Sequence, residues 1–377
     1  MPGARVLIRH KGEVLIDRAY GFHTYDSIDQ VKPDDIYDFA SITKVTTVLP
    51  ALMLLVDRGQ FDLDATLADY YPDFRKTNKA DLPWRRILAH DAKIQSWIAY
   101  WEKTVKKNGK FRARTFKSRR SRRYPIEVTE HLFLHKNYRK KMIKAIKKSP
   151  LNEDEGYVYS GLAFYLLPEI IENITGTPFE TFLRDEVYSP IGAGTLGYNP
   201  LTRFPVGRIV PTERDTFFRM TQIQGRVHDE GAAMMGGVSG NAGLFGTAED
   251  LSKMATLYLN RGIWQGDTII SPLVVDEFTR CQYCYKGNKR GLGFDKPPWS
   301  VEPEAESVTI SPEASAESYG HSGYTGTLIW VDPTYDLTFV FLSNRVYPTR
   351  MNWKINELKV RPAIHQAAYD VILSENR

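Results

Sequence analysis

Apolar runs near both ends of the chain have the length and residue types of β-strands. Residues 5–8 and 14–16 form two such runs around a Lys-Gly turn. Residues 328–331 and 337–342 form two more, and the intervening Pro-Thr-Tyr-Asp at 333–336 is typical of a hairpin loop. We therefore expect an antiparallel sheet built from N-terminal and C-terminal strands.

Helical spacing dominates the rest of the chain, and Gly and Pro mark its interruptions. A long apolar helix is expected from about 42 to 58, with a kink or break at Pro50 and a stop at Gly59. Apolar residues at i, i+3, i+4, i+7 and i+8 from Leu251 predict an amphipathic helix, and a last helix is expected at about 354–374. The strands at the two ends thus enclose a mostly helical middle.

The basic residues are concentrated in one segment. The 377-residue chain carries a formal net charge of +5, yet residues 102–150 hold 18 Lys and Arg against three Glu. The second half of this segment has helical spacing, with Met142, Ile143 and Ile146 on one side. We interpret the segment as the solvated face of an inserted subdomain. Its charge would attract an anionic polymer, and a charged lid beside the functional site is a second hypothesis.

Composition excludes several classes of protein. The hydrophobic fraction of 42% and the charged fraction of 25% are those of a globular domain, and no apolar run reaches the about 18 residues of a membrane helix. No nucleic-acid motif or stacking platform of aromatic residues is present, so no specific nucleic-acid partner is expected. Charged residues interrupt the first 13 positions, so no signal peptide is expected. The stretch from 298 to 318, rich in Pro, Glu and Ser, predicts a flexible loop.

Cys281 and Cys284 form a single C-x-x-C pair. A zinc site needs a second pair or His partners at fixed spacing, and none is visible. We expect either two structural thiols or one local disulfide.

The candidate chemistry begins with Ser41 and Lys44, at the start of the first long helix. Residues three apart are neighbours on one helix face, so the Lys amine can reach the Ser hydroxyl and take its proton. A Ser at a helix N-terminus also lies where backbone N–H groups favour negative charge. S-x-x-K alone is a weak signal, because a Ser N-cap and a solvated Lys give the same pattern.

Two later segments strengthen the interpretation of Ser41 and Lys44 as a catalytic pair. Tyr159-Ser160-Gly161 leads into a helical pattern, and His321-Ser322-Gly323 leads into the strand at 328–331. S-x-x-K, then Tyr, then His-Ser-Gly is the motif order of the serine β-lactamase and penicillin-binding-protein superfamily. The chain resembles its class C-like branch, because Tyr159 occupies the second motif and His321 opens the third.

The resemblance extends to most of the chain and is nearest to β-lactamase-like domains fused to secreted bacterial glycosidases of the β-N-acetylglucosaminidase type. It implies an α/β (α+β) fold of the β-lactamase/transpeptidase type, with an antiparallel sheet flanked by helices. Residues 1–60 and 265–377 would form the sheet-containing region and residues 61–264 a mostly helical region, together one compact catalytic unit. The sequence alone allows a cytoplasmic protein or a domain of a longer secreted one; the resemblance favours a periplasmic or cell-envelope location and a glycosidase fusion.

The resemblance also implies a serine hydrolase that forms an acyl-enzyme and needs no metal or organic cofactor. Ser41 would be the nucleophile, and Lys44 and Tyr159 would share the roles of general base and acid, the base being either one. The N–H groups of Ser41 and Tyr324 would form the oxyanion hole. His321, Ser322, Gly323 and Tyr324 would contact the substrate, an ester or a peptidoglycan-related peptide or amide.

Three departures from the family pattern weaken the expectation of β-lactam hydrolysis. Gly161 stands where the family has Asn or Asp. His321 replaces the Lys that gives true β-lactamases a fixed cation, and residues 88–94 differ from the usual His-Thr-Ser-Gly-Leu. Arg345 or Arg350 could supply a carboxylate anchor instead, or be an ordinary surface arginine.

Two alternative functions follow from these departures: a non-catalytic envelope-binding module with a degenerate site, and a weak β-lactamase. A Ser-His-Asp triad through His228 and Asp229 is a weaker reading, because adjacent side chains point in different directions and no G-x-S-x-G elbow exists. We expect a structural role for both.

Overall fold

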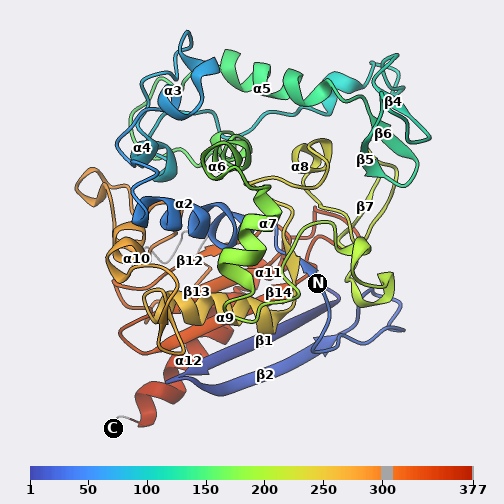
Figure 1. The fold of residues 1–377 in the computed structure, drawn as a ribbon. Helices are drawn as coiled ribbons and strands as arrows, with labels where there is room; N and C mark the ends of the chain where they lie inside the picture. The colour runs from blue at the N-terminus through green and yellow to red at the C-terminus, as the bar shows by residue number, and fades with distance from the viewer. Residues whose placement is uncertain (299–308, 376–377) are drawn as a thin grey trace.

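The two ends of the chain form a five-stranded antiparallel sheet, as predicted (Figure 1). The computed structural model describes residues 1–298 and 309–375. The strand order is β12-β13-β14-β1-β2, so the C-terminal β14 pairs directly with the N-terminal β1. These strands are β1 (Gly3–His10), β2 (Glu13–Gly21), β12 (Tyr319–Ser322), β13 (Leu328–Asp332) and β14 (Leu337–Ser343).

The alternation of side chains along β1 gives the sheet two apolar faces. Val6 and Ile8 belong to the smaller core cluster, which helix α12 (Val360–Glu375) covers with Tyr369. Leu7 belongs to the larger core, which includes helix α9 (Ala248–Leu259), packed on β13 and β14. The sheet is therefore covered by helices on both sides.

The region between the terminal strands combines short helices with small hairpins that the hydrophobic pattern did not predict. The helices are α3 (Leu67–Tyr70), α4 (Trp84–Leu88), α5 (Tyr138–Lys148), α6 (Leu167–Thr175), α7 (Phe179–Leu183), α8 (Glu230–Met234) and α10 (Pro272–Thr279). The small strands are β3 (Tyr37–Asp38), β4 (Phe116–Lys117), β5 (Ile126–Thr129), β6 (Leu132–Leu134), β7 (Glu213–Asp215), β8 (Thr221–Ile223), β9 (Phe245–Gly246), β10 (Ile263–Trp264) and β11 (Asp267–Thr268). In the described residues six 3-10 turns, η1, η2, η3, η5, η6 and η7, lie at Pro72–Phe74, Glu102–Thr104, Ala163–Tyr165, Pro200–Thr202, Val206–Arg208 and Cys284–Lys286, and a π-helical turn, η4, lies at Arg184–Tyr188.

The predicted helix from 42 to 58 is two helices, α1 (Ile42–Thr46) and α2 (Val48–Asp57). The break lies at Thr47, three residues before Pro50. Pro50 falls in the first turn of α2, where its missing N–H costs nothing, and its ring excludes a continuous helix through the preceding turn. Pro50 therefore accounts for the break, which lies on the N-terminal side of the proline and not at the proline itself.

Two further sequence predictions need adjustment. The last helix is divided into α11 (Lys354–Glu357) and α12, because Lys359 has a positive φ of 48°. Pro298 and residues 309–318 contain no helix or strand, in keeping with a loop; the rest of the predicted flexible stretch, 299–308, lies outside the described residues. The predicted helices at 251–259 and in the basic segment are confirmed as α9 and α5.

Candidate active site

Ser41 lies at a tight turn between strand β3 and helix α1. Ala40, directly before it, has a positive φ of 48°, which is uncommon for a residue with a Cβ. The Ala40 N–H donates to Oδ1 of Asp38 at 2.8 Å, and Oδ2 of Asp38 accepts from the N–H of His228 at 2.6 Å. Burial raises the pKa of Asp38. The buried carboxyl group thus holds the turn that presents the serine.

Lys44 is 2% exposed and its amine points back to the serine. Its Nζ lies 3.1 Å from Oγ of Ser41 and 2.9 Å from the carbonyl oxygen of Asn241. The aromatic rings of Tyr159 and Phe164 lie 5.2 Å and 5.3 Å from the same nitrogen. Within residues 1–298 and 309–375 no carboxylate pairs with Lys44. The first two predicted residues therefore form the expected hydrogen-bonded pair.

The glycine-rich segment around Asn241 passes close to the first helix. Leu244 donates its N–H to Oγ1 of Thr43 at 3.0 Å, next to the lysine. A Cβ at Gly240 would lie 2.4 Å from the carbonyl oxygen of Phe164, so the backbone can pass here only with glycine. Asn241 itself is fixed by side-chain bonds to Ser239 and Tyr165. This packing positions the carbonyl that the lysine uses.

Tyr159 is adjacent to this pair but its hydroxyl does not bond to it. The hydroxyl oxygen is buried and has no hydrogen-bond partner among the described residues. The ring centroid lies 6.0 Å from that of His321, from the third motif. The structure thus brings the three motifs together, and the Tyr159 hydroxyl makes no hydrogen bond to the other two motifs.

His90 and Arg290 surround Tyr159, and the motif analysis gave neither of them a role. The His90 ring lies 4.6 Å from the Tyr159 ring, and its Nδ1 accepts from the N–H of Ser160 at 3.1 Å. Burial, aided by Arg290 and Lys44, lowers the pKa of His90 well below its usual value. A neutral His90 therefore orients the Tyr159 segment.

Arg290 places its positive charge close to the ring of Tyr159. Its guanidinium carbon lies 5.6 Å from the Tyr159 ring centroid and it forms an ion pair with Asp295. Position 90 could be noticed in the sequence because residues 88–94 depart from the family pattern. Nothing in the local sequence of Arg290 distinguishes it from a surface arginine, so only the fold reveals its position.

The third motif ends strand β12 with a neutral histidine. Nδ1 of His321 lies 2.6 Å from the carbonyl oxygen of Ser322, so this nitrogen carries the proton and Nε2 is an acceptor. Burial lowers the pKa of His321 to about 4. Nε2 is buried and has no partner among the residues that the structure describes. The motif therefore offers a hydrogen-bond acceptor instead of the fixed cation of a lysine.

The turn after this strand is joined to the backbone that precedes Ser41. Oγ1 of Thr325 donates to the carbonyl of Asp38 at 2.8 Å, and Oγ1 of Thr327 donates to that of Phe39 at 3.1 Å. A Cβ at Gly323 would lie 2.5 Å from the Phe39 oxygen, so this approach requires glycine.

This contact joins the two segments that carry the expected oxyanion donors. The backbone N–H groups of Ser41 and Tyr324 have no acceptor in the described part of the chain. Both belong to the two segments that the threonine bonds join. An unpaired pair of N–H groups beside a serine is the arrangement that an acyl oxyanion needs.

Arg350 does not provide the carboxylate anchor that the sequence suggested for this site. It bonds to Glu213 and Glu230, so its charge is already neutralised. Arg345 donates to the carbonyl groups of Tyr324 and Asn352 and supports the turn from below.

His228 and Asp229 have the structural roles expected of them. His228 pairs with Glu213 at 2.8 Å, while Asp229 caps helix α8 by accepting from Ala232 at 2.7 Å. Their side chains therefore serve different elements and form no triad with Ser41.

Other parts of the chain add little chemistry. Cys281 and Cys284 form a local disulfide. In the residues that the structure describes, no group of His, Cys, Asp and Glu could hold a metal ion. None of the described helices combines the length and apolar character needed to cross a membrane.

Comparison with known proteins places this geometry in a family. The model of the Beta-lactamase family matches residues 1–360. "N-acetylmuramyl-L-alanine amidase" of Bacillus subtilis (strain 168) is 28% identical over 91% of this chain and 77% of its own length. "Putative D-alanyl-D-alanine carboxypeptidase" of Salmonella agona is 29% identical over 94% of this chain and 81% of its own.

A solved structure supports the fold. The class C beta lactamase from Rhodobacter sphaeroides matches with a TM-score of 0.63 and 17% identity, over the whole of this chain and 95% of that one. The helix-covered antiparallel sheet described above is therefore that of the β-lactamase and penicillin-binding-protein fold.

Proposed function

The chain belongs to the beta-lactamase family and is a serine hydrolase, and we propose that it works through an acyl-enzyme formed at Ser41. The single observation that carries this proposal is the 3.1 Å bond between the Lys44 amine and the Ser41 hydroxyl. A buried amine in this position can take the hydroxyl proton as the oxygen attacks.

The proposed acylation step moves one proton and forms one bond. The Lys44 amine accepts the Ser41 proton while Oγ bonds to the substrate carbonyl carbon. The N–H groups of Ser41 and Tyr324 donate to the resulting oxyanion. Collapse of the tetrahedral intermediate breaks the bond to the amine or alcohol, which leaves with a proton. In deacylation a water molecule bonds to the acyl carbon and gives one proton to the Tyr159 oxygen, while the Ser41 oxygen leaves the acyl carbon and takes its proton back from Lys44.

We assign the base role to Lys44 and the leaving-group acid to Tyr159. Lys44 bonds directly to the serine, whereas the Tyr159 hydroxyl has no partner among the described residues. A buried hydroxyl without a partner is available to donate to a leaving nitrogen or oxygen, which supports this division of roles.

The proposed substrate is an amide or ester without a free carboxylate next to the scissile bond. His321 is neutral at pH 7, because burial lowers its pKa to about 4, and Arg350 is neutralised by Glu213 and Glu230. Neither His321 nor Arg350 therefore offers a free cation to the carboxylate of a β-lactam, and the guanidinium of Arg345 is held by the backbone carbonyl groups of Tyr324, Arg350 and Asn352. The names of the relatives support a peptidoglycan-related amide or peptide and a location in the cell envelope.

A panel of substrates tests this function. Purified protein and its Ser41→Ala variant are incubated with N-acetylmuramyl-L-alanine carboxamide, in which the alanine carboxylate is blocked, a peptide ending in D-Ala-D-Ala, a short p-nitrophenyl ester and a fluorescent penicillin. We expect Ser41-dependent hydrolysis of the muramyl amide or the ester, and slower reaction of the substrates with a carboxylate beside the bond. Binding without turnover would indicate a binding module, and fastest turnover of penicillin would indicate a β-lactamase; either result would refute the proposal.

A further inference from the structure

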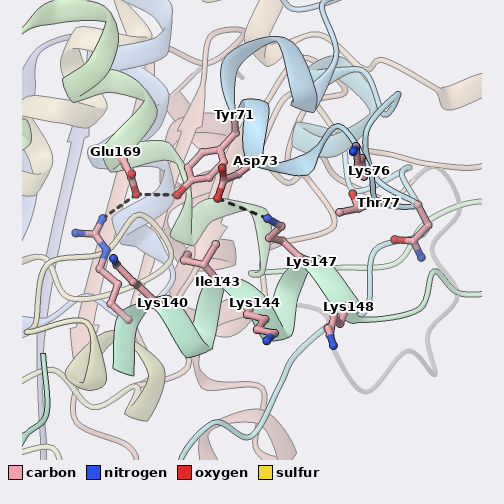
Figure 2. A pocket seen from close by; sticks show the side chains of 12 residues that line it. Tyr71, Asp73, Lys76, Thr77, Lys140, Ile143, Lys144, Lys147, Lys148 and Glu169 are labelled. Carbon is pink, nitrogen blue, oxygen red and sulfur yellow. Dashed lines mark hydrogen bonds and ion pairs between the residues drawn. The ribbon is translucent and has the colours of Figure 1, made fainter. Parts of the chain in front are cut away.

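Helix α5 borders a groove at the edge of the molecule that has no part in the proposed chemistry. Figure 2 shows the groove between α5, the η1 turn and the start of α6, with a volume of about 920 Å³. Helix α6 in turn packs on α2, so the groove and the Ser41 site lie on different layers.

Six cationic side chains and only two acidic ones line the groove. Both acidic residues are already paired: Asp73 lies 3.5 Å from Lys147, and Glu169 lies 3.3 Å from Arg139. The four remaining cations are exposed and have no partner among the described residues; they are Lys76, Lys140, Lys144 and Lys148. We call these four residues the lysine row.

The helix gives most of the row a regular spacing. Met142 and Ile146 are buried and anchor one face of α5, so the opposite face is exposed. Lys140, Lys144 and Lys148 follow each other at i, i+4 and i+8, about 6 Å apart along the axis at a rise of 1.5 Å per residue. Like charges at this spacing repel and destabilise a helix. An anionic ligand that spans about 12 Å would relieve that repulsion.

We propose that the groove binds a linear polyol-phosphate polymer, whose charges repeat along a flexible chain. Lysine binds phosphate as a point charge, and a row of lysines complements a row of phosphates better than a single small anion does. Among the described residues that line the groove Tyr71 is the one aromatic, and its hydroxyl donates to Glu169 at 2.9 Å, so no series of rings is present on which successive bases could stack. A phosphate polymer without bases therefore fits better than nucleic acid. The proposal goes beyond the chemistry at Ser41 and does not depend on it.

Fluorescence anisotropy with labelled poly(glycerol phosphate) of about ten repeats tests the proposal. Four neutralised phosphates predict a slope of about −3 for log affinity against log salt, which is about 50-fold weaker binding at 200 mM than at 50 mM NaCl. Replacing the whole lysine row by Gln should weaken binding at 50 mM at least tenfold and bring the slope toward zero. The single change Lys144→Gln should reduce the slope by about 0.7.

A matched variant controls for net charge. Four exposed lysines elsewhere in the basic segment, Lys106, Lys107, Lys110 and Lys117, are replaced by Gln together. We expect this control to retain most of the affinity, and both quadruple variants to retain covalent labelling at Ser41. Equal weakening by the two quadruple variants would overturn the proposal. So would absence of binding at 50 mM NaCl, or tighter binding of an oligothymidylate or a polyglutamate of equal charge. The Ser41→Ala variant should bind the polymer like the wild type. Polymer binding is therefore tested independently of the proposed hydrolase activity at Ser41.

Discussion

The amine of Lys44 donates to the carbonyl oxygen of Asn241 at 2.9 Å, across 197 positions of sequence. The same amine donates to Ser41, so the carbonyl and the serine fix it from two sides. This explains how a site with Gly161 in the second motif can still hold its lysine. A backbone carbonyl cannot be lost by substitution, so this support survives changes of side chain nearby.

Lys44→Met should lower the second-order rate of labelling by a fluorophosphonate about 10²- to 10⁴-fold, the usual contribution of a positioned base. The methionine fills similar space but cannot take the Ser41 proton. Lys79→Met is the matched control, because Lys79 is also fully buried and also bonds to a backbone carbonyl, that of Ser149. The control should retain labelling; equal loss in both variants would indicate a folding defect and contradict the assigned role.

Tyr159→Phe tests the division of roles between the two proton carriers. The ring contacts with His90 and Arg290 remain, and only the unpartnered hydroxyl is removed. We expect fluorophosphonate labelling to fall less than in Lys44→Met, whereas turnover of an amide, which needs a protonated leaving group, should fall at least tenfold. Loss of labelling as complete as in Lys44→Met would assign the base to the tyrosine instead.

Gly161→Asn should be tolerated. A Cβ at position 161 would have its nearest neighbour, Cβ of Asn241, at 3.7 Å, which is an ordinary contact. The free energy of unfolding measured in urea should therefore change by less than about 1 kcal/mol. A loss of several kcal/mol would show that the segment packs more closely than the structure indicates.

Gly323→Ala provides the contrasting case. Its Cβ would lie 2.0 Å from Oγ1 of Thr327 and 2.5 Å from the Phe39 oxygen, so the turn must move away from Ser41. We expect a loss of stability of about 1 to 3 kcal/mol, as for other overpacked sites, together with a loss of covalent labelling. Unchanged labelling would refute the placement of the Tyr324 N–H in the oxyanion hole.

The buried His365 should make the protein less stable in acid. Burial lowers its pKa from 6.5 to about 3, and Nδ1 accepts from the N–H of Ser311 at 3.2 Å. The unfolded chain binds a proton at His365 more readily than the folded protein does. The free energy of unfolding is therefore unaffected by this residue above pH 6.5 and decreases as the pH falls from 6.5 toward 3.

His365→Asn keeps an acceptor for Ser311 but cannot titrate. Between pH 7.5 and pH 5 the wild type should lose about 2 kcal/mol more unfolding free energy than the variant. Urea unfolding at the two pH values measures the difference. Identical losses in the two proteins would show that His365 is protonated as easily in the folded state.

The strands could be predicted from sequence because their apolar runs and turns are local. The hairpin at 333–336 and the turn between β1 and β2 were found in this way. The exact position of the helix break near Pro50 and the positive φ of Lys359 could not be predicted from sequence, because tertiary packing decides where a helix is interrupted. The small hairpins of the middle region were missed because two- to four-residue strands carry too short a pattern.

The candidate site was predictable only where side-chain chemistry defines a motif. Ser41, Lys44 and Tyr159 are recognised by residue type and order. The support from Asn241 is a backbone carbonyl, which any residue could provide, and its role depends on packing at Gly240. Arg290 acts through its distance to Tyr159, which no local spacing encodes.

Mapping the residue modified by a fluorophosphonate probe tests the central claim most directly. The intact protein is labelled, digested and analysed by mass spectrometry, with Ser41→Ala as the control. We predict one adduct on the peptide that contains Ser41, absent from the variant. An adduct on another serine, or equal labelling of Ser41→Ala, would contradict the account.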